Sequence, residues 1–141
     1  MMATPGHAGA DDLVRDHHVS APFVPRCVVV DDGTFDWGGD TRPPLLLLHG
    51  FTGHAHAWVT LSIALQPHFH VYALDQRGHG ESDPAEVYNP VVALDDIGGV
   101  LVELGLTTLD VIGLSMGGRN AMYLASKRPE VVRRLVVVDI G

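Results

Sequence analysis

Leu109-Asp110-Val111-Ile112-Gly113-Leu114-Ser115-Met116-Gly117 combines an apolar run with a G-x-S-x-G pattern, and a helix-like segment follows it directly. A serine in a sharp turn between a strand and a helix projects its hydroxyl outward, as a nucleophile must. The glycines on either side of Ser115 allow such a turn, because they have no Cβ that would collide where the chain crosses itself. Since a G-x-S-x-G pattern also arises by chance, a nucleophile is indicated only if the rest of the chain agrees with this fold.

Length and composition indicate one globular domain. The chain has 141 residues, of which 46% are hydrophobic and 18% are charged, and this is enough apolar material for a buried core. The formal net charge of -8 at pH 7 argues against a nucleic-acid partner, because phosphate binding requires clustered Lys and Arg side chains.

The N-terminal residues and the cysteine content bear on localisation. Residues 1–22 mix His, Asp, Gly, Pro and Ala without an apolar segment, and so they predict a mobile tail rather than a signal peptide or a membrane span. Cys27 is the one cysteine of the sequence and cannot form an internal disulfide, which fits a reducing compartment. A cytoplasmic protein with no membrane partner is expected.

Short apolar runs predict about six strands. Residues 26–30 and 31–37 predict an antiparallel hairpin with a turn at Gly33, where glycine permits a positive φ. A continuous apolar run over residues 44–49 predicts a strand buried on both faces. Further strands are predicted over residues 70–75, 109–114 and 135–139.

Helices alternate with these later strands. The spacing of apolar residues predicts helices over residues 58–65, 90–104 and 116–128. Asn89 and Pro90 suit the start of the second helix, and Gly105 suits its end. The alternation predicts an α/β fold over residues 23–141, with a mainly parallel sheet and helices on both faces. In such sheets the functional side chains gather at the carboxyl ends of the strands.

Three strand-end segments occur in order, namely His49-Gly50-Phe51, Asp75-Gln76-Arg77-Gly78-His79-Gly80-Glu81-Ser82 and Gly113 to Gly117. Together they resemble the α/β-hydrolase family, in its subgroup of lid-bearing serine hydrolases and related esterases, lactonases and carbon-carbon bond hydrolases. The resemblance extends from about residue 23 to the end of the sequence, and the ordered set is far more specific than any one motif.

The resemblance implies a serine hydrolase that acts on an ester, a lactone or a similar acyl substrate without a cofactor. Ser115 would be the nucleophile that forms an acyl-enzyme. The backbone N–H groups of Phe51 and Met116 would form the oxyanion hole, and Met116 suits this role because a helix N-terminus favours developing negative charge. The segment that contains His79 is mainly structural in the family, so no catalytic role is assigned to His79.

The sequence departs from the family pattern in its triad. The family order is serine, acid, histidine, yet no histidine follows Ser115, and Asp139 matches an acid position that some members use. The chain therefore resembles the N-terminal half of a hydrolase, with an incomplete core. Little or no turnover is expected from it alone, because nothing activates the Ser115 hydroxyl. The strand over residues 135–139 is expected to be an exposed edge that favours self-association.

An NAD(P)-dependent short-chain oxidoreductase is a competing interpretation. Tyr123 and Lys127 form a Tyr-x-x-x-Lys pair, and Asp75 follows Gly53 at a spacing near that of a ribose-binding acid. The turn that contains Gly53 lacks the three-glycine fingerprint of dinucleotide sites, and Ser115 is too close to Tyr123 for the serine spacing of that family. Both features argue against an oxidoreductase.

A metal site and a binding module also have to be considered. The pairs His54/His56 and His68/His70 contain possible ligands, but the residues between them supply no more, so no metal is expected. A non-catalytic binding module of the same fold remains possible, because the sequence lacks a general base after the nucleophile.

Overall fold

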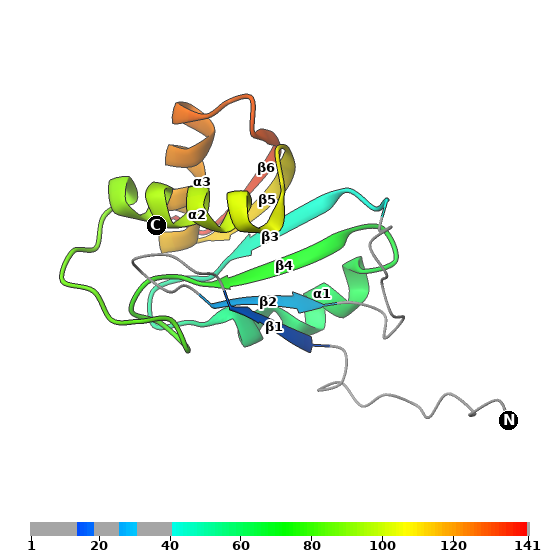
Figure 1. The fold of residues 1–141 in the computed structure, drawn as a ribbon, viewed down its shortest axis with the longest axis horizontal. Coiled ribbons are helices and arrows are strands. Elements are labelled where there is room, and N and C mark those ends of the chain that lie inside the picture. The colour runs from blue at the N-terminus through cyan, green and yellow to red at the C-terminus, as the bar shows by residue number, and fades with distance from the viewer. Residues whose placement is uncertain (1–13, 19–25, 31–40, 141) are drawn as a thin grey trace, which may run out of the picture.

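The computed structural model describes residues 14–18, 26–30 and 41–140, which form one sheet with helices packed against it (Figure 1). The strand order is β1-β2-β4-β3-β5-β6. The strands are β1 Val14–His18, β2 Arg26–Val30, β3 Pro44–Leu48, β4 His70–Asp75, β5 Leu109–Leu114 and β6 Val132–Val138. The helices are the 3-10 turn η2 Ala55–Trp58, and α1 Val59–Leu65, α2 Pro90–Leu104 and α3 Met116–Lys127.

The central part of the sheet is parallel, as the alternation of strands and helices predicts. Strand β3 pairs in parallel with both β4 and β5, and β6 pairs in parallel with β5. The apolar run Leu45 to Leu48 in β3 is buried along its whole length, because helices cover both faces of a parallel sheet. The predicted α/β class is confirmed by these pairings.

The N-terminal strands differ from the sequence prediction. Strand β2 lies where a strand is predicted, but its antiparallel neighbours are β1 and β4. Residues 31–37, the predicted hairpin partner, lie outside the described residues. Strand β1 lies within the predicted tail of residues 1–22, where the register pairs Val14 with Val30. Pairing with an open strand edge satisfies backbone groups whatever the side chains are, so hydrophobic patterning alone does not reveal such a strand.

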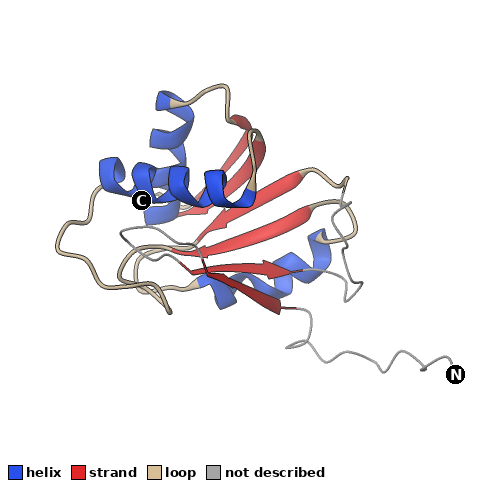
Figure 2. Cartoon of the chain, viewed as in Figure 1, coloured by secondary structure: helices blue, strands red, loops and turns tan. Residues whose placement is uncertain are grey.

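Figure 2 shows the helices arranged around the sheet, and a separate layer of apolar side chains lies on each face of the sheet. Successive residues of a strand point to opposite faces, so Leu46 and Leu48 pack on the side of α2 and α3. Leu45 and Leu47 pack on the opposite side, against Trp58 and Leu65 of η2 and α1. Helices therefore cover both faces of the parallel strands, as predicted.

Helix α2 begins and ends at the residues that the sequence indicates. The Asn89 side chain accepts a hydrogen bond from the backbone N–H of Val92 at 3.0 Å, and Pro90 occupies the first turn, where no intrahelical donor is needed. Gly105 ends the helix with a φ of 68°, a conformation that glycine adopts without a Cβ clash. These local signals set where α2 starts and stops between β4 and β5.

Candidate active site

Ser115 occupies a strained turn between β5 and α3. Its φ of 50° and ψ of -111° lie outside the backbone regions that residues other than glycine favour. Ser115 is exposed. A Cβ added to Gly113 would lie 2.5 Å from the Gly117 carbonyl oxygen, and one added to Gly117 would overlap the Leu48 carbonyl. The two glycines thus let α3 start against the end of β3, which leaves the Ser115 hydroxyl facing outward.

The turn after β3 lies beside Ser115. A Cβ built on Gly50 would be 3.5 Å from the Ser115 Cβ, and the N–H of Gly53 closes the turn by donating to the Gly50 carbonyl at 3.0 Å. Phe51, within this turn, is 72% exposed. Met116 is the first residue of α3, where backbone N–H groups have no partner inside the helix. The structure therefore brings the turn that contains Phe51 and the start of α3 together at Ser115.

His49 is buried below this turn and is fully engaged. Its Nδ1 lies 2.8 Å from the Gly50 carbonyl, and its Nε2 accepts from the backbone N–H of Gln76 at 3.0 Å. These partners assign the neutral ring with the proton on Nδ1. Burial is the main cause that lowers the pKa of His49, since a charged imidazole loses hydration in the interior. His49 positions the turn and is not available as a general base for Ser115.

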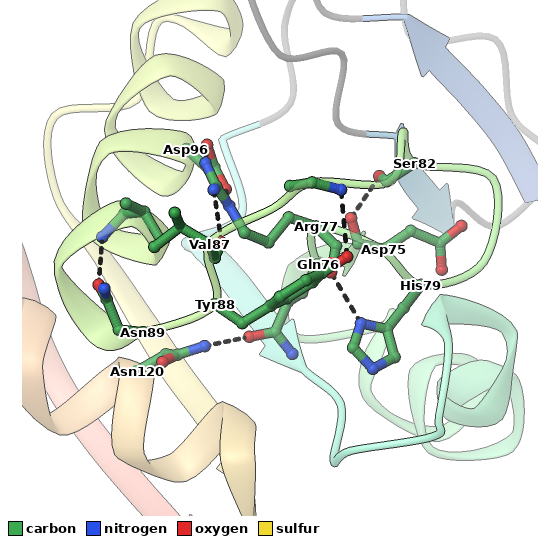
Figure 3. Close-up of polar contacts among 12 residues, drawn as sticks. Asp75, Gln76, Arg77, His79, Ser82, Val87, Tyr88, Asn89, Asp96 and Asn120 are labelled. Atoms are coloured by element: carbon green, nitrogen blue, oxygen red, sulfur yellow. Dashed lines mark hydrogen bonds and ion pairs between the residues drawn. The ribbon is translucent and has the colours of Figure 1, made fainter.

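Gln76, which follows β4, links the end of β3 to α3 through buried hydrogen bonds, and Figure 3 shows the bond to Asn120. Its Nε2 donates to the His49 carbonyl at 2.7 Å, and its Oε1 accepts from Asn120 Nδ2 at 2.7 Å. The sequence pattern alone predicts no role for Gln76 or Asn120. The one available signal is a polar residue directly after a buried strand, but its partner on α3 is 44 positions away.

Asp75 organises the loop after β4. Its carboxylate accepts from the backbone N–H of Ala55 at 2.6 Å and of Glu81 at 2.9 Å, and Ser82 Oγ donates to its carbonyl at 2.5 Å. All these interactions hold loops in place, so Asp75 has a structural function here. The carboxylate is occupied by backbone donors rather than directed at a ribose.

His79 lies in the same loop and contacts the turn after β3. Its Nδ1 lies 2.8 Å from the Arg77 carbonyl. The His79 ring meets Phe51 edge-on with centroids 5.7 Å apart, and it is 5.0 Å from the His49 ring. His79 therefore supports the Phe51 turn from the side of the β4 loop.

A pocket of about 300 Å³ opens between this loop, the start of α2 and the start of α3. Phe51 and Met116 form part of its wall. Arg77 crosses its side as a bidentate partner of Asp96, with Nε and an Nη 2.7 and 2.9 Å from the two carboxylate oxygens (Figure 3). Hydrogen bonding to Asp96 is the main cause that raises the pKa of Arg77. The pocket thus reaches Met116, the residue that follows Ser115, and the Arg77–Asp96 ion pair holds one of its sides.

Asp139 follows the last residue of β6. The Val138 carbonyl accepts the backbone N–H of Ser115 at 2.9 Å, so Asp139 is one residue from a direct backbone partner of Ser115. Asp139 is exposed, and its φ of 44° is one that aspartate tolerates better than most residues. No contact in the described part of the chain commits this carboxylate to an ion pair or a hydrogen bond.

The Tyr123/Lys127 pair that suggested an oxidoreductase lies apart from Ser115. Lys127 Nζ is 5.5 Å from the ring centroid of Tyr123 near the C-terminal end of α3, whereas Ser115 precedes the first residue of that helix. The rings of His54 and His56 are 6.0 Å apart. Within residues 14–18, 26–30 and 41–140, no group of three His, Cys, Asp or Glu residues could hold a metal ion. No helix in that part of the chain has the length and apolar character of a membrane span.

Comparison with known proteins agrees with the geometry. Residues 43–140 match the alpha/beta hydrolase fold family model. The chain is 35% identical over 132 residues to 2-(acetamidomethylene)succinate hydrolase of Mesorhizobium japonicum, covering 92% of this chain and 46% of the relative. It is 37% identical over 122 residues to an esterase of Mycobacterium tuberculosis, covering 84% of this chain and 40% of that protein.

Solved structures match the fold as well. A crystal structure of E-2-(acetamidomethylene)succinate hydrolase matches with a TM-score of 0.79 at 29% identity, over 91% of this chain and 45% of the matched chain. A hydrolase of Novosphingobium aromaticivorans matches with a TM-score of 0.78 at 28% identity, over 92% of this chain and 45% of the matched chain. The chain spans less than half the length of these relatives. Its parallel sheet, its strained turn at Ser115 and the match over residues 43–140 show that it belongs to the alpha/beta hydrolase fold family.

Proposed function

We propose that this chain supplies the nucleophile and the oxyanion hole of a serine hydrolase that cleaves an ester, a lactone or a similar acyl substrate. Ser115 attacks the acyl carbonyl, and the N–H groups of Phe51 and Met116 stabilise the oxyanion that forms. The observation that carries the proposal is the strained backbone of Ser115, with φ 50° and ψ -111°. Strain of this kind costs roughly 1–3 kcal/mol and is concentrated at functional sites.

The surroundings of Ser115 support this role. The turn after β3 approaches Ser115 closely enough to place a Gly50 Cβ 3.5 Å from its Cβ, and Phe51 and Met116 both line the adjacent pocket. Relatives named as a hydrolase and an esterase contain segments that align with this chain. Loss of one oxyanion donor costs on the order of 3 kcal/mol of transition-state stabilisation, so the position of these two amides matters for the rate.

The proposed enzyme also needs a general base and an acid. No histidine follows Ser115 in the sequence, and His49, next to the turn, has both ring nitrogens engaged. We therefore propose that the chain by itself has little or no turnover, and that the histidine comes from the half of the fold that the relatives contain in addition. Asp139 is the candidate acid on this chain.

A fluorophosphonate probe tests the proposal. With a second chain that supplies the later strands of the fold, we expect labelling of Ser115, loss of labelling in Ser115→Ala, and ester hydrolysis that the 141-residue chain alone lacks. Ser126→Ala is the matched control, because Ser126 is an exposed serine near the far end of α3. Normal turnover by the chain alone would contradict the need for a base, and a complemented protein that stays unlabelled would favour a non-catalytic binding module.

A further inference from the structure

We propose that Arg119 selects acyl substrates that carry a carboxylate a few bonds from the scissile carbonyl. The inference rests on the proposed function, because it names a substrate class for the same site. It comes from the charges that line the pocket beside Ser115.

The pocket is mainly apolar. Its volume of about 300 Å³ suits a small acyl group. The apolar residues of its wall include Phe51, Leu74, Ala93, Ile97 and Met116. A hydrocarbon segment of the substrate can pack there, and any charged group of the substrate has to find its partner among the few ionisable side chains of the lining.

Among the described residues, the charged side chains of the lining are Arg77, Asp96 and Arg119. Arg77 and Asp96 neutralise each other in a bidentate ion pair, with side chains only 16% and 10% exposed. Arg119 is exposed, and its guanidinium forms no ion pair or hydrogen bond with the described residues. The described lining therefore has one uncompensated positive charge, in a chain whose formal net charge is -8.

Arg119 is also correctly placed relative to the nucleophile. Its backbone N–H donates to the Ser115 carbonyl at 3.0 Å, so Arg119 lies in the first turn of α3, directly after Ser115 in space. Arg119 and Met116, the residue that follows Ser115, both line the pocket, and helical side chains lean toward the helix N-terminus. A carboxylate bound to Arg119 in this pocket would therefore lie near the end of α3 that Ser115 precedes.

The chemistry of arginine favours this ligand. The planar guanidinium presents paired N–H donors that match the two oxygens of a carboxylate, and the resulting hydrogen bonds are about twice as strong as those between neutral groups. The Asp96 carboxylate accepts two hydrogen bonds from the Arg77 guanidinium on the same pocket wall. A substrate carboxylate would use Arg119 in the same way.

The test is an NMR titration of the 15N-labelled chain with two matched ligands, monomethyl succinate, which carries one carboxylate, and the neutral dimethyl succinate. We expect monomethyl succinate to shift the amide signals of Met116 and Asn120 and to bind roughly tenfold more tightly than the diester. Arg119→Gln should abolish this preference, and Arg119→Lys should retain part of it. Arg134→Gln is the matched control, because Arg134 is an exposed arginine on β6 outside the pocket lining, and it should keep the full preference.

Equal affinity for the two ligands, an unchanged preference in Arg119→Gln, or an equal loss in Arg134→Gln would each overturn the inference. The titration does not depend on catalysis, so Ser115→Ala should bind monomethyl succinate as the wild type does. A preference that depends on Arg119, in a complemented protein whose Ser115 stays unlabelled, would overturn the proposed function and leave the carboxylate site standing. Labelling of Ser115 together with equal affinity for monomethyl succinate and dimethyl succinate would support the proposed function and overturn the carboxylate site.

Discussion

Gln76 Oε1 accepts a hydrogen bond from Asn120 Nδ2 at 2.7 Å, which ties the end of β4 to the helix that follows Ser115. Both side chains are buried, so removal of one partner leaves a buried polar atom unsatisfied. We expect Asn120→Ala to lower the free energy of unfolding by roughly 1–3 kcal/mol in urea denaturation. In a double-mutant cycle, Gln76→Ala and Asn120→Ala should be clearly less than additive. Additive effects would mean that the hydrogen bond does not couple the two elements.

Two glycine-to-alanine substitutions should have opposite effects. At Gly117 the new methyl group would overlap the Leu48 carbonyl, whereas at Gly99, within α2, it would meet nothing within 4 Å. We expect Gly117→Ala to lower the free energy of unfolding by about 1–3 kcal/mol, because the added methyl group overpacks the contact. Gly99→Ala should stabilise it by about 0.5–1 kcal/mol, because alanine is the better helix former. Thermal unfolding of both variants provides the measurement, and similar midpoints would contradict the close approach of α3 to β3.

The backbone strain at Ser115 can be measured by comparing the free energies of unfolding of two variants at this position. Glycine accepts the backbone conformation of residue 115, with its φ of 50°, while alanine does not. We expect Ser115→Gly to be about 1 kcal/mol more stable than Ser115→Ala in denaturant unfolding, although both variants lack the Ser115 hydroxyl. A less stable Ser115→Gly would indicate that the turn is relaxed.

Acidification should destabilise the fold through His49. Burial lowers the pKa of this ring below its ordinary value of 6.5, so the unfolded chain binds more protons than the folded chain between the two pKa values. The contribution of His49 to stability is complete above about pH 6.5 and falls as the pH drops below it. His49→Asn should reduce the slope of unfolding free energy against pH in that range, and His68→Asn, an exposed position, is the control with the same histidine count. An NMR titration of the His49 ring in the wild type gives the pKa directly, and a value at or above 6.5 would contradict the prediction.

The edge strand β6 should mediate self-association of the chain. It is the last strand in the described sheet order, and Val136 and Val138 are 52% and 42% exposed. Lysine on an edge strand opposes pairing with a second edge, so Val136→Lys should reduce the concentration dependence of the sedimentation coefficient. Val102→Lys is the control, because it changes an exposed valine on α2. It should leave the concentration dependence of the sedimentation coefficient unchanged. A wild-type chain that sediments as a monomer at all concentrations would contradict the prediction.

The parts of the fold that the sequence predicts well depend on neighbouring residues. Asn89, Pro90 and Gly105 mark the ends of α2 because a helix cap is built from residues within one turn of it. Strand β6 begins at Val132, earlier than the predicted residue 135, and Arg133 within it contacts Asp110 at 2.9 and 2.7 Å. A polar residue in that position interrupts the apolar pattern, although it pairs well with a carboxylate on the adjacent strand.

The site is predictable where a motif determines the backbone and unpredictable where the fold joins distant segments. The glycines on either side of Ser115 predict the turn, because a Cβ at either position would collide with neighbouring backbone atoms. No sequence motif marks Gln76 or Arg119. The role of Gln76 depends on its hydrogen bond with Asn120. The role proposed for Arg119 depends on the ion pair that neutralises Arg77 and Asp96. Such partnerships form only after the strands are ordered.

The contact of Gly117 with the Leu48 carbonyl has a practical consequence for redesign of the pocket. Because it is a backbone contact, the approach of α3 to the end of β3 does not depend on pocket side chains such as Arg119 and Tyr88. If the proposed function holds, substitutions at Arg119 and Tyr88, which line the pocket, should change substrate preference while the Ser115 turn and the Phe51 turn keep their relative positions.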